Sequence, residues 1–165
     1  MAKHKSSAGL PPEINISINT DTFNEAFLPY ATGIWAYEVY YGGRGSGKSE
    51  FVADKFVLQL SDSRNAGRNL MCLRKAKNDA RNSMFPQIQI ALKKFKLLDL
   101  WEINKTDLHM TCLANDNEIS FGGMDDVENV KSYKYANGNM TDLWYEEATE
   151  EYDMRNMRQL RDSMR

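Results

Sequence analysis

The sequence predicts an α/β fold with a mainly parallel sheet flanked by helices. Short apolar or alternating runs typical of strands recur along the chain, and amphipathic stretches of helical period separate several of them. A glycine-rich turn also lies between a strand-like run and a helical stretch. Strands that alternate with helices favour a parallel sheet. Three short strand-like runs in succession are the exception, and they predict a small antiparallel meander inserted into this fold.

Size and composition fit one globular domain. The chain has 165 residues, of which 42% are hydrophobic and 27% charged, so a disordered or fibrous protein is excluded. No apolar run approaches the roughly 18 residues of a membrane-spanning helix. Cys72 and Cys112 are too few for a disulfide framework or a four-cysteine zinc site. We therefore expect a protein of a reducing compartment that has no membrane partner.

The first third of the chain is expected to hold an arm, two strands and two helices. Residues 1–12 are polar and end in two prolines, which is typical of a flexible arm, so the folded domain is predicted over 13–165. Residues 13–19 alternate like a strand, and 22–30 fit a short helix. The aromatic and β-branched run AYEVYY predicts a strand over 36–41. An apolar stripe then predicts a helix over Lys48–Leu60.

The remainder reads as strands and helices in alternation. A buried strand is predicted at Asn69–Arg74, followed by helical spacing over Asn78–Phe95 that Pro86 must kink or break. The meander strands are predicted at Trp101–Lys105, Leu108–Leu113 and Glu118–Phe121. A last buried strand, Thr141–Tyr145, precedes a helix whose N-cap is expected to be Thr149.

Charge is divided along the chain, although the formal net charge is only -2. Residues 64–96 contain nine Lys and Arg against one acid, whereas residues 116–153 contain eleven acids against two lysines. This division fits one face for an anionic ligand and another for a metal or a cationic element. It fits two ordinary solvated faces as well.

The glycine-rich turn GGRGSGKS fits the phosphate-loop pattern G-x-x-x-x-G-K-[ST] at every position. It consists of Gly42, Gly43, Arg44, Gly45, Ser46, Gly47, Lys48 and Ser49. Glycines let backbone N–H groups wrap an anion, and the positive end of the next helix favours phosphates. Lys48 supplies a cation to the β- and γ-phosphates, and Ser49 supplies a hydroxyl ligand for Mg²⁺. Tyr37, Tyr40 and Tyr41 are alternative candidates for contact with the base.

A second acidic motif separates the classes of phosphate-loop protein. Leu143–Tyr145 is an apolar strand end, and the adjacent carboxylates Glu146 and Glu147 follow it. Glu146 is suited to the Mg²⁺ shell, and Glu147 to polarising an attacking water as a general base. Two such acids are typical of ATP-hydrolysing motors of the ASCE type, whereas small GTPases carry D-x-x-G there. We therefore predict an ATPase with ATP and Mg²⁺ as cofactors.

Several segments resemble the large terminase subunit of tailed bacteriophages, particularly the PBSX-like group. Besides the phosphate loop they are LRKAKNDARNSMFPQI (Leu73–Ile88), NDNEISFGGMDDVENVKS (Asn115–Ser132), LWYEEATE (Leu143–Glu150) and LRDSMR (Leu160–Arg165). Their order and spacing agree, and together they cover about residues 37–165. Glu146 stands where the family's Walker B motif has an aspartate.

The resemblance implies the ATPase half of the motor that drives double-stranded DNA into a preformed capsid. The implied partners are double-stranded DNA, the terminase small subunit, the portal protein and further copies in a ring on the portal. The implied location is the host cytoplasm and not the mature virion. A DNA helicase of the same motor branch and a non-hydrolytic nucleotide-binding module are the alternatives, and Glu147 argues against the second.

The resemblance also assigns roles to single residues. Arg44 occupies the place of a basic residue proposed to stabilise, within the same subunit, the charge on the transferred phosphoryl group. Arg74 and Arg81 are candidates to reach a neighbouring subunit's nucleotide, and pairing with carboxylates is equally compatible with the sequence.

A strand that comes later in the sequence would separate the phosphate-loop strand from the strand that ends at Glu146 in this class. Only enough residues for one helix follow Glu147. We therefore expect a partial ATPase domain that is incomplete at the C-terminus, the N-terminal piece of a longer subunit, without the family's nuclease domain.

Overall fold

The computed structural model describes residues 18–150 and 154–164. Within them the helices are α1 (Lys48–Ser61), α2 (Lys77–Asn82), α3 (Met84–Lys94), α4 (Val127–Ser132) and α5 (Met154–Ser163). The strands are β1 (Leu70–Arg74), β2 (Trp101–Asn104), β3 (His109–Cys112), β4 (Glu118–Gly123) and β5 (Asp142–Tyr145). The predicted arm, residues 1–12, and most of the predicted strand 13–19 lie outside the described residues.

The five strands form one sheet in the order β2-β3-β4-β1-β5. Strand β1 is parallel to β4 and to β5, whereas β2, β3 and β4 are paired antiparallel. The sheet is therefore mixed and not mainly parallel. The predicted meander exists but is no separate insertion, because β4 is both its last strand and the parallel neighbour of β1.

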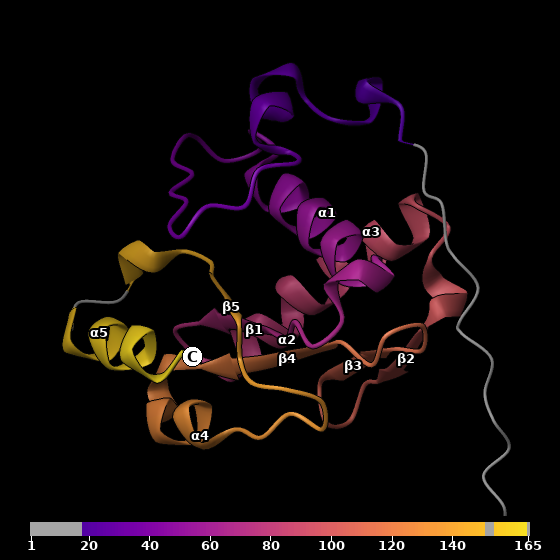
Figure 1. Cartoon of the computed structure of the whole chain (residues 1–165). Coiled ribbons are helices and arrows are strands. Elements are labelled where there is room, and N and C mark those ends of the chain that lie inside the picture. Colours follow the sequence, from indigo (N-terminus) through magenta and orange to yellow (C-terminus); the bar gives the residue numbers. More distant parts are fainter. Residues whose placement is uncertain (1–17, 151–153, 165) are drawn as a thin grey trace, which may run out of the picture.

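Helices cover both faces of this sheet (Figure 1). The side chains of β1 alternate between two cores: Leu70 and Cys72 pack with α1 and α3, and Met71 and Leu73 pack with α4 and α5. Helix α1 spans the predicted stretch because its apolar stripe faces the first core. In the described part of the chain no helix has the length and apolar character needed to cross a membrane.

Two helix predictions need correction. The stretch 78–95 breaks at Ser83, between α2 and α3, and not at Pro86. Pro86 lies in the first turn of α3, where a missing N–H leaves no helical hydrogen bond unmade. The stretch 22–30 forms two 3₁₀ turns instead of one helix, with Pro29 inside the second.

Thr149 is not the N-cap of the last helix. It lies inside a 3₁₀ turn, η6 (Ala148–Glu150), and α5 begins only at Met154. The chain turns early because Glu147 adopts a left-handed backbone, with φ of 55°. The amide of Glu150 then donates to the carbonyl of Glu147 at 2.9 Å.

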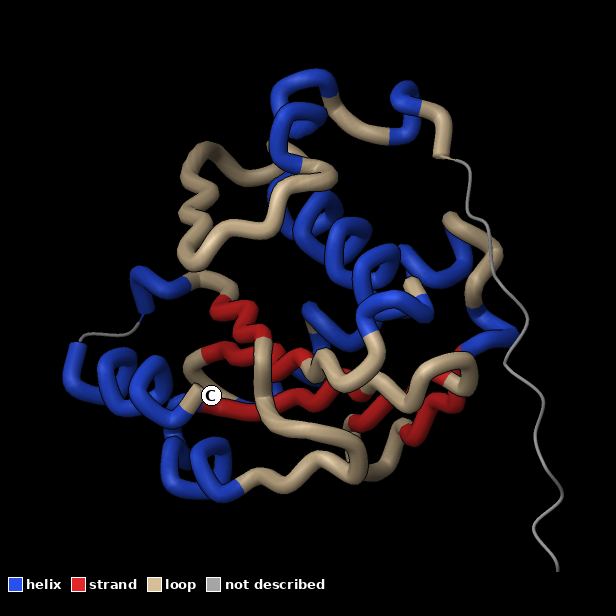
Figure 2. The backbone as a smooth tube through the Cα atoms, in the orientation of Figure 1, coloured by secondary structure: helices blue, strands red, loops and turns tan. Residues whose placement is uncertain are grey.

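The predicted strand over residues 36–41 is wrong, since this segment forms an irregular loop that leads into α1 (Figure 2). Val39 is 84% exposed and Tyr41 92%. An aromatic and β-branched pattern becomes a strand only where a neighbouring strand completes its hydrogen bonds and packing. Here side chains hold the loop instead: Glu38 pairs with Lys55 of α1 at 2.5 Å, and Tyr40 packs edge-on against Phe51 of α1.

Candidate nucleotide-binding site

The predicted phosphate loop leads directly into α1. Gly45 and Gly47 have φ of 76° and 82°, a left-handed conformation that a side chain would disfavour. Helix α1 begins at Lys48, and its N-cap Gly47 makes no side-chain hydrogen bond to the first turn. The first N–H groups of α1 therefore lack a side-chain acceptor at the cap, and together with the helix dipole they suit an anion.

The side chain of Lys48 folds back over this loop. Its ammonium donates to the carbonyls of Gly42 and Gly43, both at 2.9 Å, and to Ser46 Oγ at 3.0 Å. All three acceptors are neutral, so the charged oxygens of a phosphate would make stronger contacts with the same ammonium. Ser49 lies half-buried in the first turn of α1, and Arg44 is exposed on the loop. The structure thus gathers the predicted phosphate-loop residues at one helix end.

Glu146 directly follows β5 and is held from β1. Its amide donates to the carbonyl of Leu73 at 3.0 Å, which extends the parallel ladder by one step. Its side chain is only 13% exposed. The carboxylate atom Oε2 accepts from Ser83 Oγ at 3.1 Å and from Arg74 Nη1 at 3.4 Å. This predicted metal ligand therefore has a fixed place at the carboxyl edge of the sheet.

Glu147, the predicted general base, has different surroundings. Its side chain is exposed, whereas that of Glu146 is largely buried. The left-handed backbone of Glu147 is uncommon for any residue other than glycine. The two adjacent carboxylates are thus separated in environment, as two different chemical roles would require.

Arg74 and Arg81 both find partners within the chain. Arg74 Nη2 donates to Glu150 at 3.2 and 3.3 Å, in addition to the contact with Glu146. Burial alone would lower the pKa of Arg74, but the hydrogen bond to Glu150 and the charges of both glutamates raise it above its usual value. Arg81 instead donates to the backbone carbonyls of Lys105 and Thr106, at 3.2 and 3.3 Å.

The link between Arg74 and Glu146 could not be found in the sequence. Pairing of Arg74 with carboxylates is one of the two interpretations that the sequence leaves open. No spacing pattern in the sequence identifies Glu146, which is 72 positions away, as the partner. The usable signal in the sequence is the place of each residue at the end of a predicted strand. It becomes a contact only once β1 and β5 are known to be neighbours.

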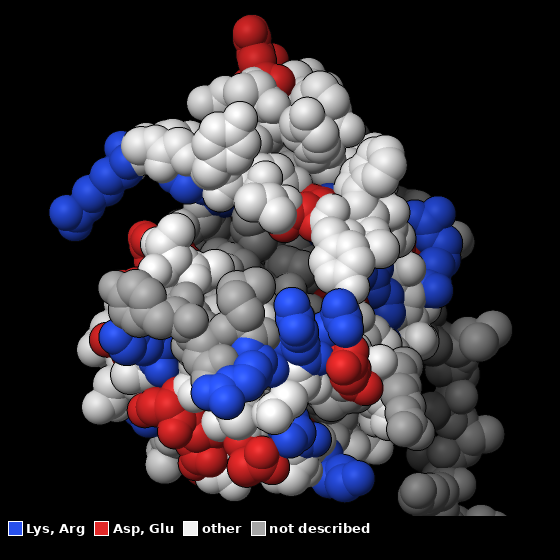
Figure 3. Space-filling view, turned by 90° about the vertical axis from the view of Figure 1, so that its left-hand side faces the viewer, with Lys and Arg blue, Asp and Glu red and all other residues white. Residues whose placement is uncertain are grey.

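Basic side chains gather on the face that carries these elements. Figure 3 views the side on which the loop before α1 and the turn after β5 lie in Figure 1. Lys and Arg side chains lie below a hollow near the middle of this face, acidic side chains border the hollow at its upper right, and further acidic side chains lie lower down. The basic side chains beside this hollow suit an anionic ligand.

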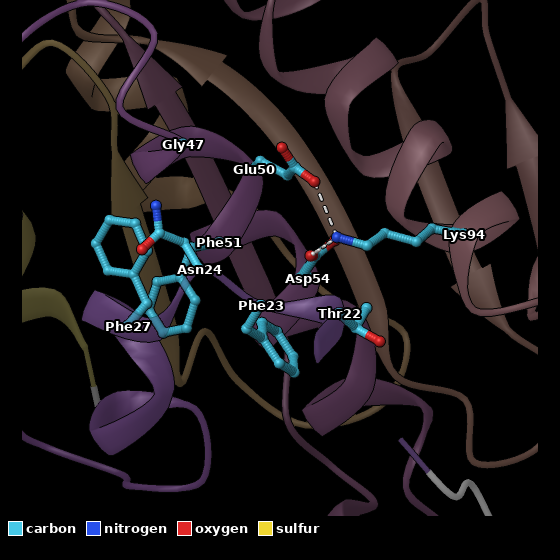
Figure 4. A pocket seen from close by; sticks show the side chains of 9 residues that line it. All are labelled: Thr22, Phe23, Asn24, Phe27, Gly47, Glu50, Phe51, Asp54 and Lys94. Atoms are coloured by element: carbon cyan, nitrogen blue, oxygen red, sulfur yellow. Dashed lines mark hydrogen bonds and ion pairs between the residues drawn. The ribbon is translucent and has the colours of Figure 1, made fainter. Parts of the chain in front are cut away.

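A small cavity behind the phosphate loop lies where side chains connect α1 and α3, and it is not a nucleotide site. Its volume is about 50 Å³, and Gly47 and three phenylalanines are among its lining residues. Lys94 reaches from α3 to two carboxylates of α1, Glu50 at 2.8 Å and Asp54 at 2.6 Å (Figure 4). Burial raises the pKa of Asp54, and the contact with Lys94 works against that rise. This cluster joins α1 to α3 beneath the loop.

A larger groove of about 400 Å³ lies beside the segment that precedes the phosphate loop. Tyr37 and Tyr41, two of the three candidates for contact with the base, line it with exposed rings. Tyr40 also lines the groove, but its ring packs against Phe27 and Phe51, and its hydroxyl donates to Glu38. Tyr37 and Tyr41 are therefore the better placed candidates.

Residues 35–165 match the family model described as phage terminase large subunit. This range includes the phosphate loop, all five strands and the acidic pair after β5. The chain belongs to this family. The large terminase subunit of Bacillus phage SPP1 is 30% identical over 135 residues, which are 77% of this chain and 31% of that protein. This terminase chain thus spans about a third of that relative's length, and the family predicted from the sequence motifs is confirmed.

Proposed function

We propose that this terminase chain is an ATP-hydrolysing motor domain that drives double-stranded DNA into a procapsid. One observation carries the proposal: a glycine-rich loop with left-handed glycines opens onto the uncapped N-terminus of α1, with the Lys48 ammonium lying over it. This arrangement is suited to the phosphates of a nucleotide. Family membership and the acid pair after β5 favour ATP hydrolysis, and the site would then be of the ASCE type.

In this proposal the loop Gly42–Ser49 surrounds the phosphates and Lys48 contacts their outer oxygens. Ser49 and Glu146 offer a hydroxyl and a carboxylate, the hard oxygen ligands that Mg²⁺ takes together with substrate phosphates. When bound, Mg²⁺ would neutralise charge on the β- and γ-phosphates. The donor set therefore fits this cation.

Glu147 and Arg44 would act on the reacting groups. The exposed carboxylate of Glu147 would accept a proton from the attacking water, which makes this water a stronger nucleophile. Arg44, exposed on the loop, would offset the negative charge that develops on the transferred phosphoryl group. A non-hydrolytic binding module would need neither residue.

The partners follow from the family and are part of the proposal. They are double-stranded DNA, the terminase small subunit, the portal protein and further copies in a ring, in the host cytoplasm. A helicase of the same motor branch is the alternative, and strand-separation assays on duplex DNA with a single-stranded tail would distinguish it. A packaging motor translocates the duplex without separating its strands.

The proposal is tested by nucleotide binding. Calorimetric titration of Lys48→Ala with ATP and Mg²⁺ should show affinity at least about tenfold below that of the wild-type chain, since a charge-assisted phosphate contact contributes roughly 1.5–3 kcal/mol. Lys93→Ala, an exposed lysine of α3, is the control and should bind as wild type. Unchanged affinity in Lys48→Ala would reject the phosphate loop as the binding site.

A further inference from the structure

We infer that Arg74 is a positioning residue that sets the orientation of Glu146 and clamps the turn on which Glu147 lies. The inference rests on the proposed function, in which Glu146 contributes to the Mg²⁺ shell. It assigns Arg74 a role within its own subunit. A role at a neighbouring subunit's nucleotide would require the Arg74 guanidinium to leave Glu146 and Glu150.

The parallel pairing of β1 and β5 puts the two residues side by side. Leu73 is paired with Tyr145, so the next residue of each strand, Arg74 and Glu146, stands at the same level of the sheet. The Arg74 side chain is 15% exposed, so water screens its contact with Glu146 only weakly. Its other amino group reaches Glu150, on the far side of Glu147. One planar guanidinium therefore joins both ends of the turn.

The contacts leave one oxygen of Glu146 available. Arg74 and Ser83 both bind Oε2, whereas Oε1 has no hydrogen-bond partner among the residues that the structure describes. A carboxylate held at one oxygen cannot rotate freely, so the other oxygen keeps a defined direction. Hydrogen bonds of this kind to a ligating carboxylate tune metal affinity.

Arg74 is the more constant of the two donors. The Ser83 hydroxyl has one proton and lies 2.8 Å from the carbonyl of Asp79 as well as 3.1 Å from Glu146. It can donate to only one of them at a time. The Nε of Arg74 is buried and has no partner among the described residues, so the direction of the guanidinium is set by the contacts of its amino groups with Glu146, Glu150 and Ser83 Oγ.

The charge of Arg74 has a second effect. Glu146, Glu147 and Glu150 place three acids within five consecutive residues. A guanidinium between two of them offsets part of their mutual repulsion, and leaves the third, Glu147, exposed and without an ion pair among the described residues. Arg74 thus holds Glu146 in place and leaves Glu147 available.

The test measures how much Mg²⁺ strengthens nucleotide binding. The affinity of the whole chain for a non-hydrolysable ATP analogue is determined by titration in excess Mg²⁺ and again in EDTA, and the ratio is compared between variants. In Arg74→Ala this ratio should fall about tenfold or more, while the affinity in EDTA stays near that of the wild type. Arg74→Lys should be intermediate, because an ammonium cannot span both glutamates.

Lys93→Ala, which changes an exposed lysine of α3, is the control, and its ratio should not change. A folded Arg74→Ala that keeps the wild-type ratio would overturn the inference, as would an equal loss in Mg²⁺ and in EDTA. If Arg74→Ala does not fold, Arg74→Lys decides by the same ratio. A wild-type chain that binds no nucleotide would instead reject the proposed function, and this inference with it.

Discussion

Glu147 occupies a backbone conformation that a residue with a side chain adopts at a cost on the order of 1 kcal/mol. The surrounding hydrogen bonds impose it: the amide of Glu146 continues the ladder to β1, and the amide of Glu150 closes the 3₁₀ turn. Glycine would satisfy this backbone without strain. The turn itself therefore gives no structural reason for glutamate at this position.

Substitution of Glu147 by glycine and by alanine separates the effect of the left-handed backbone on stability from the effect of losing the carboxylate. Both variants lack the carboxylate, so their difference in stability reports only the left-handed backbone. We expect Glu147→Gly to be more stable than Glu147→Ala by about 1 kcal/mol, the reverse of the order in an ordinary helix or strand. Urea unfolding followed by circular dichroism measures this difference. Equal stabilities, or greater stability of the alanine variant, would mean that the turn relaxes when the glutamate is absent.

Conversion of each acid to its amide tests the chemical roles. In the intact motor, Glu147→Gln should keep nucleotide bound but lower the rate of phosphate release by roughly 100-fold or more, because the general base is lost. Glu146→Gln should instead weaken binding that depends on Mg²⁺. Steady-state phosphate release and nucleotide titration distinguish the two. Normal turnover in Glu147→Gln would transfer the assignment to Glu150, since Asp142 begins β5 at the opposite edge of the sheet, paired with Arg68.

At the scale of elements, one buried amide joins the end of α1 to the start of β1. Asn117 is fully buried, and its Nδ2 donates to the carbonyls of Leu60 at 3.0 Å and Asn65 at 2.9 Å. Its Oδ1 accepts from the amide of Arg68 at 3.0 Å. These backbone groups lie where a helix ends and a strand begins, so regular structure does not satisfy them. The placement of β1, and of Arg74 at its end, depends on this amide.

Asn117→Asp should therefore destabilise the fold strongly. The side chain keeps its shape but loses both donors, and the oxygen that replaces Nδ2 faces the carbonyls of Leu60 and Asn65. The expected loss in free energy of unfolding is about 3 kcal/mol or more. The control Asn78→Asp, an exposed change in the first turn of α2, should stay within about 0.5 kcal/mol. Thermal or urea unfolding compares the two, and similar values would show that the polar contacts around Asn117 contribute little.

The elements differ in how far the sequence could predict them. Local signals were sufficient for α1, because its apolar stripe lies within its own residues. They were also sufficient for β3, because a turn precedes this strand and another follows it. They failed for residues 36–41, because a strand requires a neighbour that the pattern itself does not contain. Sheet order is not local either, and the clamp from Arg74 to Glu146 and Glu150 exists only through the pairing of β1 with β5. The prediction of a phosphate loop depends on no such pairing, because its pattern is contained in eight consecutive residues.

For the molecule as a whole, two features combine on one side. Strand β5 pairs with β1 at one edge and has no strand at its other edge within the described residues. The segment that precedes the phosphate loop exposes large apolar side chains, namely Ile34, Trp35, Tyr37, Val39 and Tyr41. Open strand edges and exposed apolar surface both favour association with other chains.

We therefore expect the isolated chain to self-associate through this segment. Light scattering after size exclusion should show species larger than a monomer as concentration rises through the roughly micromolar to millimolar range. The double variant Val39→Lys, Tyr41→Lys places charge on the exposed segment and should remain monomeric to higher concentration, because charged side chains oppose both edge pairing and apolar contact. Ile90→Lys alters an exposed isoleucine of α3, 54% accessible, and should associate as the wild type does. A wild-type chain that stays monomeric throughout would mean that the aromatic packing and the pair between Glu38 and Lys55 suffice to protect this side of the molecule.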